Sequence, residues 1–362
     1  MASKTEKKNN TRSRIVSYVM NNADTSKVEI SKNLNMSMPT VLSNVNELMA
    51  GGVLMETGEY ASTGGRKAKS IGINPGYRYA MGIRITANHV GMTLVNMRSE
   101  IEKTERVRMK FSQEISYCVE LASLAKKFLG DMDEPDKLLG IGISIPGIIS
   151  QEQHLVVKSH ALQIENYSLN FLEQAFSCPV CFENDANAAM LAEDINQYQD
   201  AIYLSLNNTL GGAFCIDRKL FAGQNRKAGE FGHMILVPGG RKCYCGKKGC
   251  ADAYCAARYE TLEQFMEALS YGNSEAEKKW AEYLDHLAVL ISNLRMAYDM
   301  DIILGGEVGG YLADYMIPLG EKVMEYNGFD CDIRYLKNCT YRKEASAVGA
   351  AKHFFYELIR NI

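Results

Sequence analysis

The sequence predicts an α/β protein of two lobes that follows an N-terminal winged helix-turn-helix domain. Two observations support this fold class. Residues 12–75 combine helical periodicity, a tight turn and a basic, glycine-containing hairpin, and after Pro75 strands alternate with helices. We expect a DNA-binding domain over residues 1–76, a first lobe over 77–200, a second lobe with a cysteine-rich loop over 201–345, and a C-terminal helix over 346–362 that returns to the first lobe.

Composition indicates a soluble, intracellular protein. Of the 362 residues, 46% are hydrophobic and 23% charged, which is ordinary for globular domains. No apolar run reaches the about 18 residues that a membrane span needs, and the N-terminal residues lack the apolar segment of a secretory signal. We therefore expect a cytoplasmic location without membrane contact. Most of the ten cysteines should then be reduced thiols, and the six scattered ones are interpreted as small core residues.

Charge is distributed unevenly along the chain. The total is −3, but residues 1–75 carry a net charge of +4 and the remainder −7. A basic N-terminal segment on an acidic body is typical of a DNA-binding head joined to a sensing or catalytic domain.

Two helices joined by a tight turn are predicted between residues 26 and 52. The first should follow a cap at Asp24 or Thr25, and the second should begin at Ser37, carry Pro39 in its first turn and end at Gly51. With an earlier helix from about position 12, this is helix-turn-helix geometry. The residues expected to face the core of these two helices are Val28, Ile30, Leu34, Val41, Leu42, Val45, Leu48 and Met49.

The second of these helices should present short polar groups and one apolar contact to base edges in the major groove. The hairpin that follows has the basic tip "GGRKAK", which suits phosphates or a minor groove. A small helical domain for protein contact is the alternative, but the ordered set of helices, turn and basic wing favours DNA. The predicted DNA-binding residues are Ser37, Met38, Thr40, Ser43, Asn44, Arg66 and Lys67.

Strands are predicted in the body within residues 79–97, 138–149, 178–183, 200–223 and 301–310. A charged stretch over residues 98–110 and a helix over about 112–129 separate the first two of these segments. The strand that stops at Glu183 should run into a second helix.

Polar residues at the end of one strand form the first candidate site. The motif "ENDANAAM" places Glu183, Asn184 and Asp185 where a strand gives way to a helix, the position at which open α/β sheets bind ligands. Asp185 could accept a proton from a hydroxyl group or hold two hydroxyls of a sugar. The alternative role is that of a helix N-cap, which suits Asn and Asp equally.

The motif "AGEFGHM" supplies a second candidate, with Glu230 and His233 between glycines that allow a ligand to approach the backbone. A cysteine cluster follows His233. The set of one histidine and three cysteines suits tetrahedral zinc, and nearby glycines and lysines favour a tight loop and thiolate ligands. A thiol-disulfide redox loop and unbound thiols remain as alternatives. The predicted metal ligands are His233, Cys243, Cys245 and Cys250.

Together these residues resemble the ROK family, named for repressors, open reading frames and sugar kinases. The motifs "IGISIPGII", "ENDANAAM", "AGEFGHM", "CYCGKKGC" and "IILGGEVGG" carry the resemblance, which extends over almost the whole chain. It is to the transcriptional repressor branch, with its xylose and N-acetylglucosamine repressors. The resemblance implies an actin-like ATPase (ribonuclease H-like) fold of two lobes. In kinases of the family, the position of Asp185 is the catalytic base.

The resemblance also implies residue roles. The metal set above would hold a structural Zn²⁺. Asp252 stands where the family has a glutamate two residues beyond the last cysteine, and "KSHALQIENY" replaces a Pro-Asn motif, so the identity of the sugar is left open. The sugar-binding residues implied are Asn184, Asp185, Glu230, His233 and Asp252.

The phosphate-binding motifs of the kinases are altered in this chain. Arg84 stands where the family has an acid, and Thr86, Ala87 and Asn88 replace Gly-Gly-Thr. The second motif begins with Asn207 and Asn208 in place of glycines, and Glu307 enters the glycine turn that would face adenosine. Phosphoryl transfer requires bound and neutralised phosphates, so we expect neither ATP binding nor a catalytic residue.

These observations predict a sugar-responsive transcriptional repressor. It should bind operator DNA as a homodimer or tetramer and take a sugar or sugar phosphate between its lobes. The alternatives are an ATP-dependent ROK sugar kinase with an accessory DNA-binding domain, and a DNA-bound protein whose cleft serves as a protein-docking surface.

Overall fold

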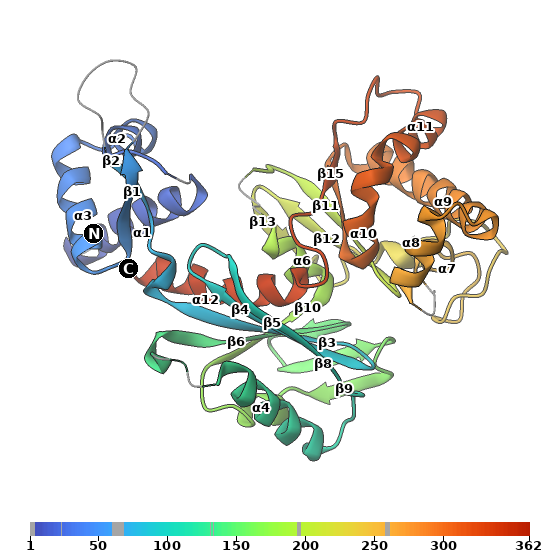
Figure 1. The fold of residues 1–362 in the computed structure, drawn as a ribbon, viewed down its shortest axis with the longest axis horizontal. Helices are drawn as coiled ribbons and strands as arrows, with labels where there is room; N and C mark the ends of the chain where they lie inside the picture. The colour runs from blue at the N-terminus through green and yellow to red at the C-terminus, as the bar shows by residue number, and fades with distance from the viewer. Residues whose placement is uncertain are drawn as a thin grey trace.

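The computed structural model describes residues 4–22, 24–59, 69–130, 132, 134–193, 197–257 and 261–362. A small helical head precedes two lobes, each built on its own five-stranded sheet (Figure 1). None of the described helices is both long and apolar enough to span a membrane. The structure therefore has the two-lobed α/β architecture with a winged helix that the sequence predicts.

Three helices and a hairpin form the head. The helices are α1 (Lys4–Asn21), α2 (Lys27–Leu34) and α3 (Met38–Ala50), and the wing strands are β1 (Leu54–Glu59) and β2 (Lys69–Ile73). Ser37 caps α3, because its Oγ accepts a hydrogen bond from the Thr40 amide at 3.4 Å, and Gly51 ends that helix as predicted. The cap of α2 is Ser26, one residue beyond the predicted positions, with its Oγ 3.2 Å from the Glu29 amide nitrogen.

Two of the residues predicted to face the core of the head are exposed. Val28 on α2 has an exposed fraction of 61%, and Leu42 on α3 has 45%. Val28 lies two residues before the buried Ile30, and Leu42 lies one residue after the buried Val41. A step of one or two residues turns a side chain by about 100–200° around a helix, so hydrophobicity alone misassigned these two.

The first sheet has the strand order β10-β6-β3-β4-β5, with β3 (Tyr79–Ile85), β4 (His89–Asn96) and β5 (Ile101–Arg108) antiparallel. Strands β6 (Leu138–Ile145) and β10 (Val180–Asn184) extend it in parallel. The edge strand β5 occupies the charged stretch in which no strand was predicted. Its side chains are exposed at almost every position, so it lacks the apolar alternation by which a strand is recognised.

The remaining elements of the first lobe flank this sheet. Helix α4 (Ile115–Leu129) lies on one face, and a small sheet of β7 (Ile148–Ser150), β8 (Leu155–Ser159) and β9 (Ile164–Ser168) follows β6. Helix α5 (Asn170–Gln174) leads to β10, and α6 (Asp185–Ala192) begins directly after it. Short 3₁₀ turns lie at Pro75–Tyr77 and Pro135–Lys137.

The second sheet repeats the order of the first, as β13-β12-β11-β14-β15. Strands β11 (Ala201–Leu206), β12 (Leu210–Ile216) and β13 (Lys219–Phe221) are antiparallel, whereas β14 (Asp301–Gly305) and β15 (Leu336–Asn338) run parallel to β11. Because the two sheets have the same topology and face each other, the carboxyl ends of their first strands, β3 and β11, lie at a shared cleft. This repetition accounts for the two-lobed shape.

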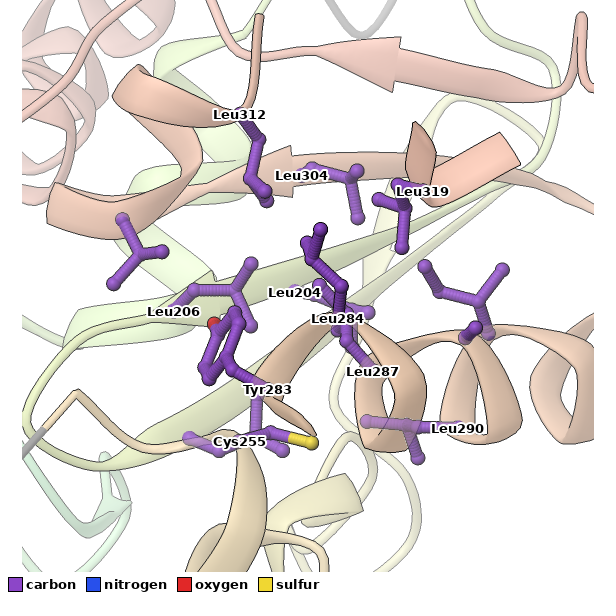
Figure 2. Packing of buried hydrophobic residues seen from close by; sticks show 14 of the residues in the cluster. Leu204, Leu206, Cys255, Tyr283, Leu284, Leu287, Leu290, Leu304, Leu312 and Leu319 are labelled. Carbon is purple, nitrogen blue, oxygen red and sulfur yellow. The ribbon is translucent and has the colours of Figure 1, made fainter. Parts of the chain in front are cut away.

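Helices cover the second sheet. They are α7 (Asp252–Cys255), α8 (Leu262–Ser270), α9 (Ser274–Tyr298), α10 (Gly306–Leu312) and α11 (Met316–Tyr326), with 3₁₀ turns at Phe231–His233 and Ala313–Tyr315. Figure 2 shows the core between them, where Leu284 and Leu287 of α9 pack towards Leu204 of β11 and Leu304 of β14. These side chains are at most 3% exposed, so the second lobe has a well-packed core of its own.

The C-terminal helix α12 (Ala345–Asn361) crosses back to the first lobe (Figure 1). It packs so closely on the first sheet that a Cβ atom on Gly82 of β3 would lie 1.9 Å from the carbonyl oxygen of Ala347. Its other end contacts α1 of the head. One buried cluster therefore includes Ile15 and Val16 of the head together with Phe355 of α12.

Candidate functional site

A cavity of about 230 Å³ opens between the lobes at the N-terminal end of α6. Asn184 and Asp185 lie on one side of it, and Glu230 and His233 lie on the other. The structure thus brings together four of the five predicted sugar-binding residues. Cavities of this size suit a small ligand whose hydroxyl groups face a few polar side chains.

Asn184 holds the start of α6. Its Oδ1 accepts hydrogen bonds from the amides of Ala186 and Asn187 at 2.9 and 3.0 Å, and its Nδ2 donates to the Gly147 carbonyl oxygen at 2.9 Å. This is the capping role that the sequence left open beside the binding role. The amide group is therefore fixed in place, and it orients Asp185 towards the cavity.

Two carboxyl groups face the cavity from opposite lobes. Desolvation raises the pKa of Asp185, although the nearby Arg84 charge opposes the rise. Desolvation and the charge of Asp185 together raise the pKa of Glu230. Each carboxyl group is thus destabilised as an anion until hydroxyl donors reach it, which is the arrangement expected for a site that binds polyols.

Asp252 lies elsewhere. It is fully buried in α7, and its Oδ1 accepts a hydrogen bond from the Leu210 amide at 2.8 Å. That bond fixes the turn at the start of β12, whose residues Leu210 to Gly212 line the cavity. Asp252 supports the wall of the cavity from behind and is not among the residues that line it.

Several residues that line the cavity were not predicted as site residues. Tyr244, which lies between two of the cysteines, places its hydroxyl oxygen 3.4 Å from His233 Nε2. His160, from the segment that replaces the family's Pro-Asn motif, packs edge-on against Tyr244 with 5.6 Å between ring centroids. Three cations complete the wall: Lys158, Arg226 and Lys227. They carry no motif of their own, because only the fold brings β8 and the loop before Glu230 together.

The cysteine-rich segment folds into a compact loop beside His233. The Cys243 amide donates to the Lys247 carbonyl oxygen at 2.9 Å, and the Gly246 amide donates to the Cys243 carbonyl oxygen at 3.1 Å. Gly249 has φ +83°, and a Cβ atom there would lie 1.8 Å from the Val237 carbonyl oxygen. The loop therefore requires glycine at this turn.

The four predicted metal ligands meet at one point. The ligand atoms of His233, Cys243, Cys245 and Cys250 lie within 4.8 Å of one another. Cys245 Sγ is 3.7 Å from Cys250 Sγ, and Cys243 Sγ is 3.8 Å from His233 Nδ1. Tetrahedral zinc with bonds of about 2.3 Å to sulfur separates two thiolates by about 3.8 Å. The donor set and its spacing fit a zinc ion.

The candidate DNA interface is the outer face of α3. Ser37, Met38, Thr40 and Ser43 are exposed there, as predicted. Asn44 was predicted on the same face, but it is 7% exposed and its Nδ2 donates to the Thr40 carbonyl oxygen at 2.8 Å. It lies on the buried stripe, three residues after Val41, so its contribution is to the fold of the helix.

Leu42, which had been assigned to the core, is also exposed on α3. In the wing, Lys69 forms an ion pair with Glu56. Arg66 and Lys67, at the predicted wing tip, lie outside the described residues.

Comparison with known proteins assigns similarity to both parts of the chain. The model of the ROK family matches residues 80–355, and a family described as winged helix-turn-helix DNA-binding matches residues 8–55. Among curated proteins, the xylose repressor of Caldicellulosiruptor bescii is 25% identical over 355 residues, covering 89% of each chain.

Solved structures show the same fold. A ROK family transcriptional regulator described as a homologue of the E. coli MLC protein superposes with a TM-score of 0.73 at 18% identity, covering 98% of this chain and 97% of that one. A ROK hexokinase from Thermus thermophilus has a TM-score of 0.62 at 23% identity, and the match covers 77% of this chain and 99% of the hexokinase. The regulator's structure therefore matches the head as well as the lobes.

Proposed function

The chain belongs to the ROK family, and from this premise we propose that it is a sugar-responsive transcriptional repressor. It binds operator DNA through the winged helix and takes a sugar or sugar phosphate in the cavity between the lobes. The contacts of α12 carry the proposal. Residues Ala345 and Ser346 at its start lie beside Asp185, and its far end contacts α1 of the head.

DNA binding rests on the exposed face of α3 and on the net charge of +4 over residues 1–75. Ser37, Met38, Thr40 and Ser43 read base edges, and Arg66 and Lys67 of the wing contact phosphates or a minor groove. A single winged helix reads one half-site, so we propose a homodimer, alone or paired into a tetramer, on a pseudo-palindromic operator. Such a protein acts in the cytoplasm, where the chromosome lies.

Effector binding rests on Asp185, Glu230 and His233, whose side chains line one cavity from both lobes. A ligand that contacts both walls favours one arrangement of the lobes, and α12 connects that arrangement to the head. We propose that the DNA-reading heads are thereby misplaced and the operator is released. We assign Asn184 and Asp252 to the support of this site, through the start of α6 and the turn at Leu210.

A structural zinc ion is assigned to His233, Cys243, Cys245 and Cys250. The ion would hold the loop in shape and fix His233 through Nδ1, which leaves Nε2 facing the cavity. Burial lowers the pKa of His233, which favours the neutral imidazole that binds a metal. In this division of the chain, residues 1–76 are the DNA-binding domain, 77–200 with 346–362 the first lobe, and 201–345 the second.

DNase footprinting tests the function directly. The chain should protect a pseudo-palindromic site upstream of its own operon, and one member of a panel of pentoses, hexoses and their phosphates should abolish the protection. Absence of any sequence-specific protection would contradict the proposal. Specific protection with no response to any sugar would instead favour a protein-docking role for the cleft.

The second candidate is an ATP-dependent sugar kinase, which the position of Asp185 at the cavity favours. A coupled ADP-release assay over the same sugars distinguishes it. We expect no turnover, whereas ADP release that is lost in Asp185→Ala would establish the kinase.

A further inference from the structure

Three residues that replace phosphate-binding positions form one hydrogen-bonded network. Arg84 lies one residue before the end of β3 in the first lobe, and Asn207 and Glu307 lie beyond β11 and β14 of the second. Arg84 Nη1 is 3.1 Å from Glu307 Oε1, and the Glu307 amide donates to Asn207 Oδ1 at 2.9 Å. Residues that are 223 positions apart in sequence are thus joined across the cleft between the lobes.

The network is well enclosed. The side chains of Arg84 and Glu307 are 17% and 18% exposed, so little solvent weakens their attraction. Arg84 Nη1 also donates to the Lys343 carbonyl oxygen at 3.2 Å, directly before α12 begins. Asn207 Nδ2 donates to Ser205 Oγ at 2.9 Å. This bond fixes the side-chain amide of Asn207, whose Oδ1 accepts the hydrogen bond from the Glu307 backbone amide.

Little space is left between Arg84 and Asp185, whereas a cavity of about 150 Å³ lies on the side of Arg84 that faces His89 and Arg106. The cavity that Arg84 and Asn207 line together with Asp185 holds about 10 Å³, close to what a single water molecule needs. This small cavity adjoins the sugar site, because Asp185 lines both. The cleft is therefore closed by side chains of the chain itself at the edge of the effector cavity.

We propose that Arg84, Glu307 and Asn207 form an interlobe tie, in which Arg84 is a positioning residue that holds the cleft closed beside Asp185. The inference rests on the proposed function, since it assigns the regulation of the same effector site. The tie joins the lobes through side chains of the chain itself, beside the cavity that the effector would occupy. Because Arg84 also bonds to Lys343, a change in the cleft reaches the first turn of α12.

A double-mutant cycle on the full-length protein, without sugar or DNA, tests the tie. The variants are Arg84→Gln, Glu307→Gln and the pair of substitutions together, with Arg84→Lys as a milder form. The matched control is Lys337→Gln, whose partner Asp301 lies 3.7 Å away within the second lobe. Hydrogen exchange is measured at the amides of residues 205–210 and 342–346, and the radius of gyration is measured by X-ray scattering.

Arg84→Gln leaves Glu307 with only the more exposed Arg106, whose Nη1 lies 3.8 Å from Glu307 Oε1, and Glu307→Gln removes the carboxylate that pairs with Arg84. We therefore expect exchange at these amides to be faster by on the order of tenfold, with a larger radius of gyration. The double variant should exchange no faster than the faster-exchanging single variant. The exchange rate of Arg84→Lys should lie between those of wild type and Arg84→Gln, and the control should exchange at the wild-type rate. Wild-type exchange in both single variants, or strictly additive effects in the double variant, would overturn the tie. Since no sugar or DNA is present, that failure would leave the repressor proposal untouched.

Discussion

Tyr244 and His233 both line the effector cavity, and the phenol oxygen of Tyr244 lies 3.4 Å from His233 Nε2. The opposite nitrogen of the same imidazole, Nδ1, lies 3.8 Å from Cys243 Sγ. One histidine ring therefore separates the metal cluster from the space in which a sugar would bind. Changes on either side of that ring should be distinguishable by experiment.

Cys243→Ser should remove the metal. Serine is a poor ligand for zinc, and three remaining donors hold the ion much less tightly. We expect the zinc content to fall from about one ion per chain to near zero. Elemental analysis of the purified protein measures this, with Cys331→Ser, an exposed cysteine outside the cluster, as the control. Full zinc occupancy in Cys243→Ser would refute the metal site.

Tyr244→Phe should weaken effector binding while zinc is retained. The substitution deletes only the hydroxyl group at His233, and a lost hydrogen bond to a bound sugar costs about 1 kcal/mol, or roughly a fivefold loss of affinity. Calorimetric titration with the effector and elemental analysis of the same sample separate the two effects. Tyr271→Phe, at a tyrosine that is 82% exposed, is the control. Unchanged affinity would place the sugar away from this loop.

Lys158→Met should discriminate between the two effector classes. Lys158, Arg226 and Lys227 line the cavity, while desolvation disfavours the anionic forms of its two carboxyl groups, so an anionic substituent is favoured there. We expect phosphorylated sugars to bind more tightly than their parent sugars, and Lys158→Met to weaken only the former, by about tenfold. Lys219→Met, at an exposed lysine on β13, is the control. Equal losses for both classes would contradict a phosphate contact.

Asp185→Asn should stabilise the protein as pH rises. The folded state raises the pKa of Asp185, so between the unfolded value of about 4 and the folded value the native chain binds more protons than the unfolded chain. The free energy of unfolding contributed by this group therefore falls as pH increases. At pH 7 the variant should melt higher by on the order of 2 °C, and the difference should shrink towards pH 4. A pH-independent difference in Tm would contradict this account, and the variant should also lose effector affinity.

Leu42→Ala and Asn44→Ala should affect different properties of the head. Leu42 is exposed on the outer face of α3, so its loss should weaken operator binding with little change in Tm. Asn44 is buried and bonded to the Thr40 carbonyl oxygen, so its loss should lower stability by about 1 kcal/mol. Electrophoretic mobility shifts and thermal melts measure the two effects, with Val119→Ala on α4 as the exposed control. The reverse pattern would mean that α3 is rotated relative to DNA.

Prediction from sequence succeeded where local chemistry determines structure. The Ser37 cap, the Gly51 terminus and the change from strand to helix follow from short-range hydrogen bonding, and the structure contains all three. The strand, predicted to stop at Glu183, ends one residue later at Asn184. The four predicted metal ligands, which come from two neighbouring motifs, also lie close together as expected.

The features that the sequence did not predict depend on tertiary packing. Whether Val28 and Leu42 face the core is decided by where α1 lies, and the edge strand β5 is held by pairing with β4 through an exposed, charged sequence. Lys158 reaches the effector cavity only because β8 is folded against it, and Asp252 lies behind the cavity because α7 is buried. The partnership of Arg84 with Glu307 could not be inferred from either position alone.

The junction between head and body has a geometric consequence for the DNA. Arg98 Nε donates to the Ile73 carbonyl oxygen at 2.8 Å, and the Met97 amide donates to that of Pro75 at 3.2 Å, so the end of the wing is fastened to the first sheet. With Phe355 and Ile15 in one buried cluster, the head is not free to swing on a tether. In the proposed dimer of such chains, the distance between the two heads is therefore fixed, and it determines the separation of the half-sites that can be bound. Insertion of about five base pairs between the half-sites should abolish recognition. Insertion of about ten should restore the helical phase of the two half-sites but not their correct separation.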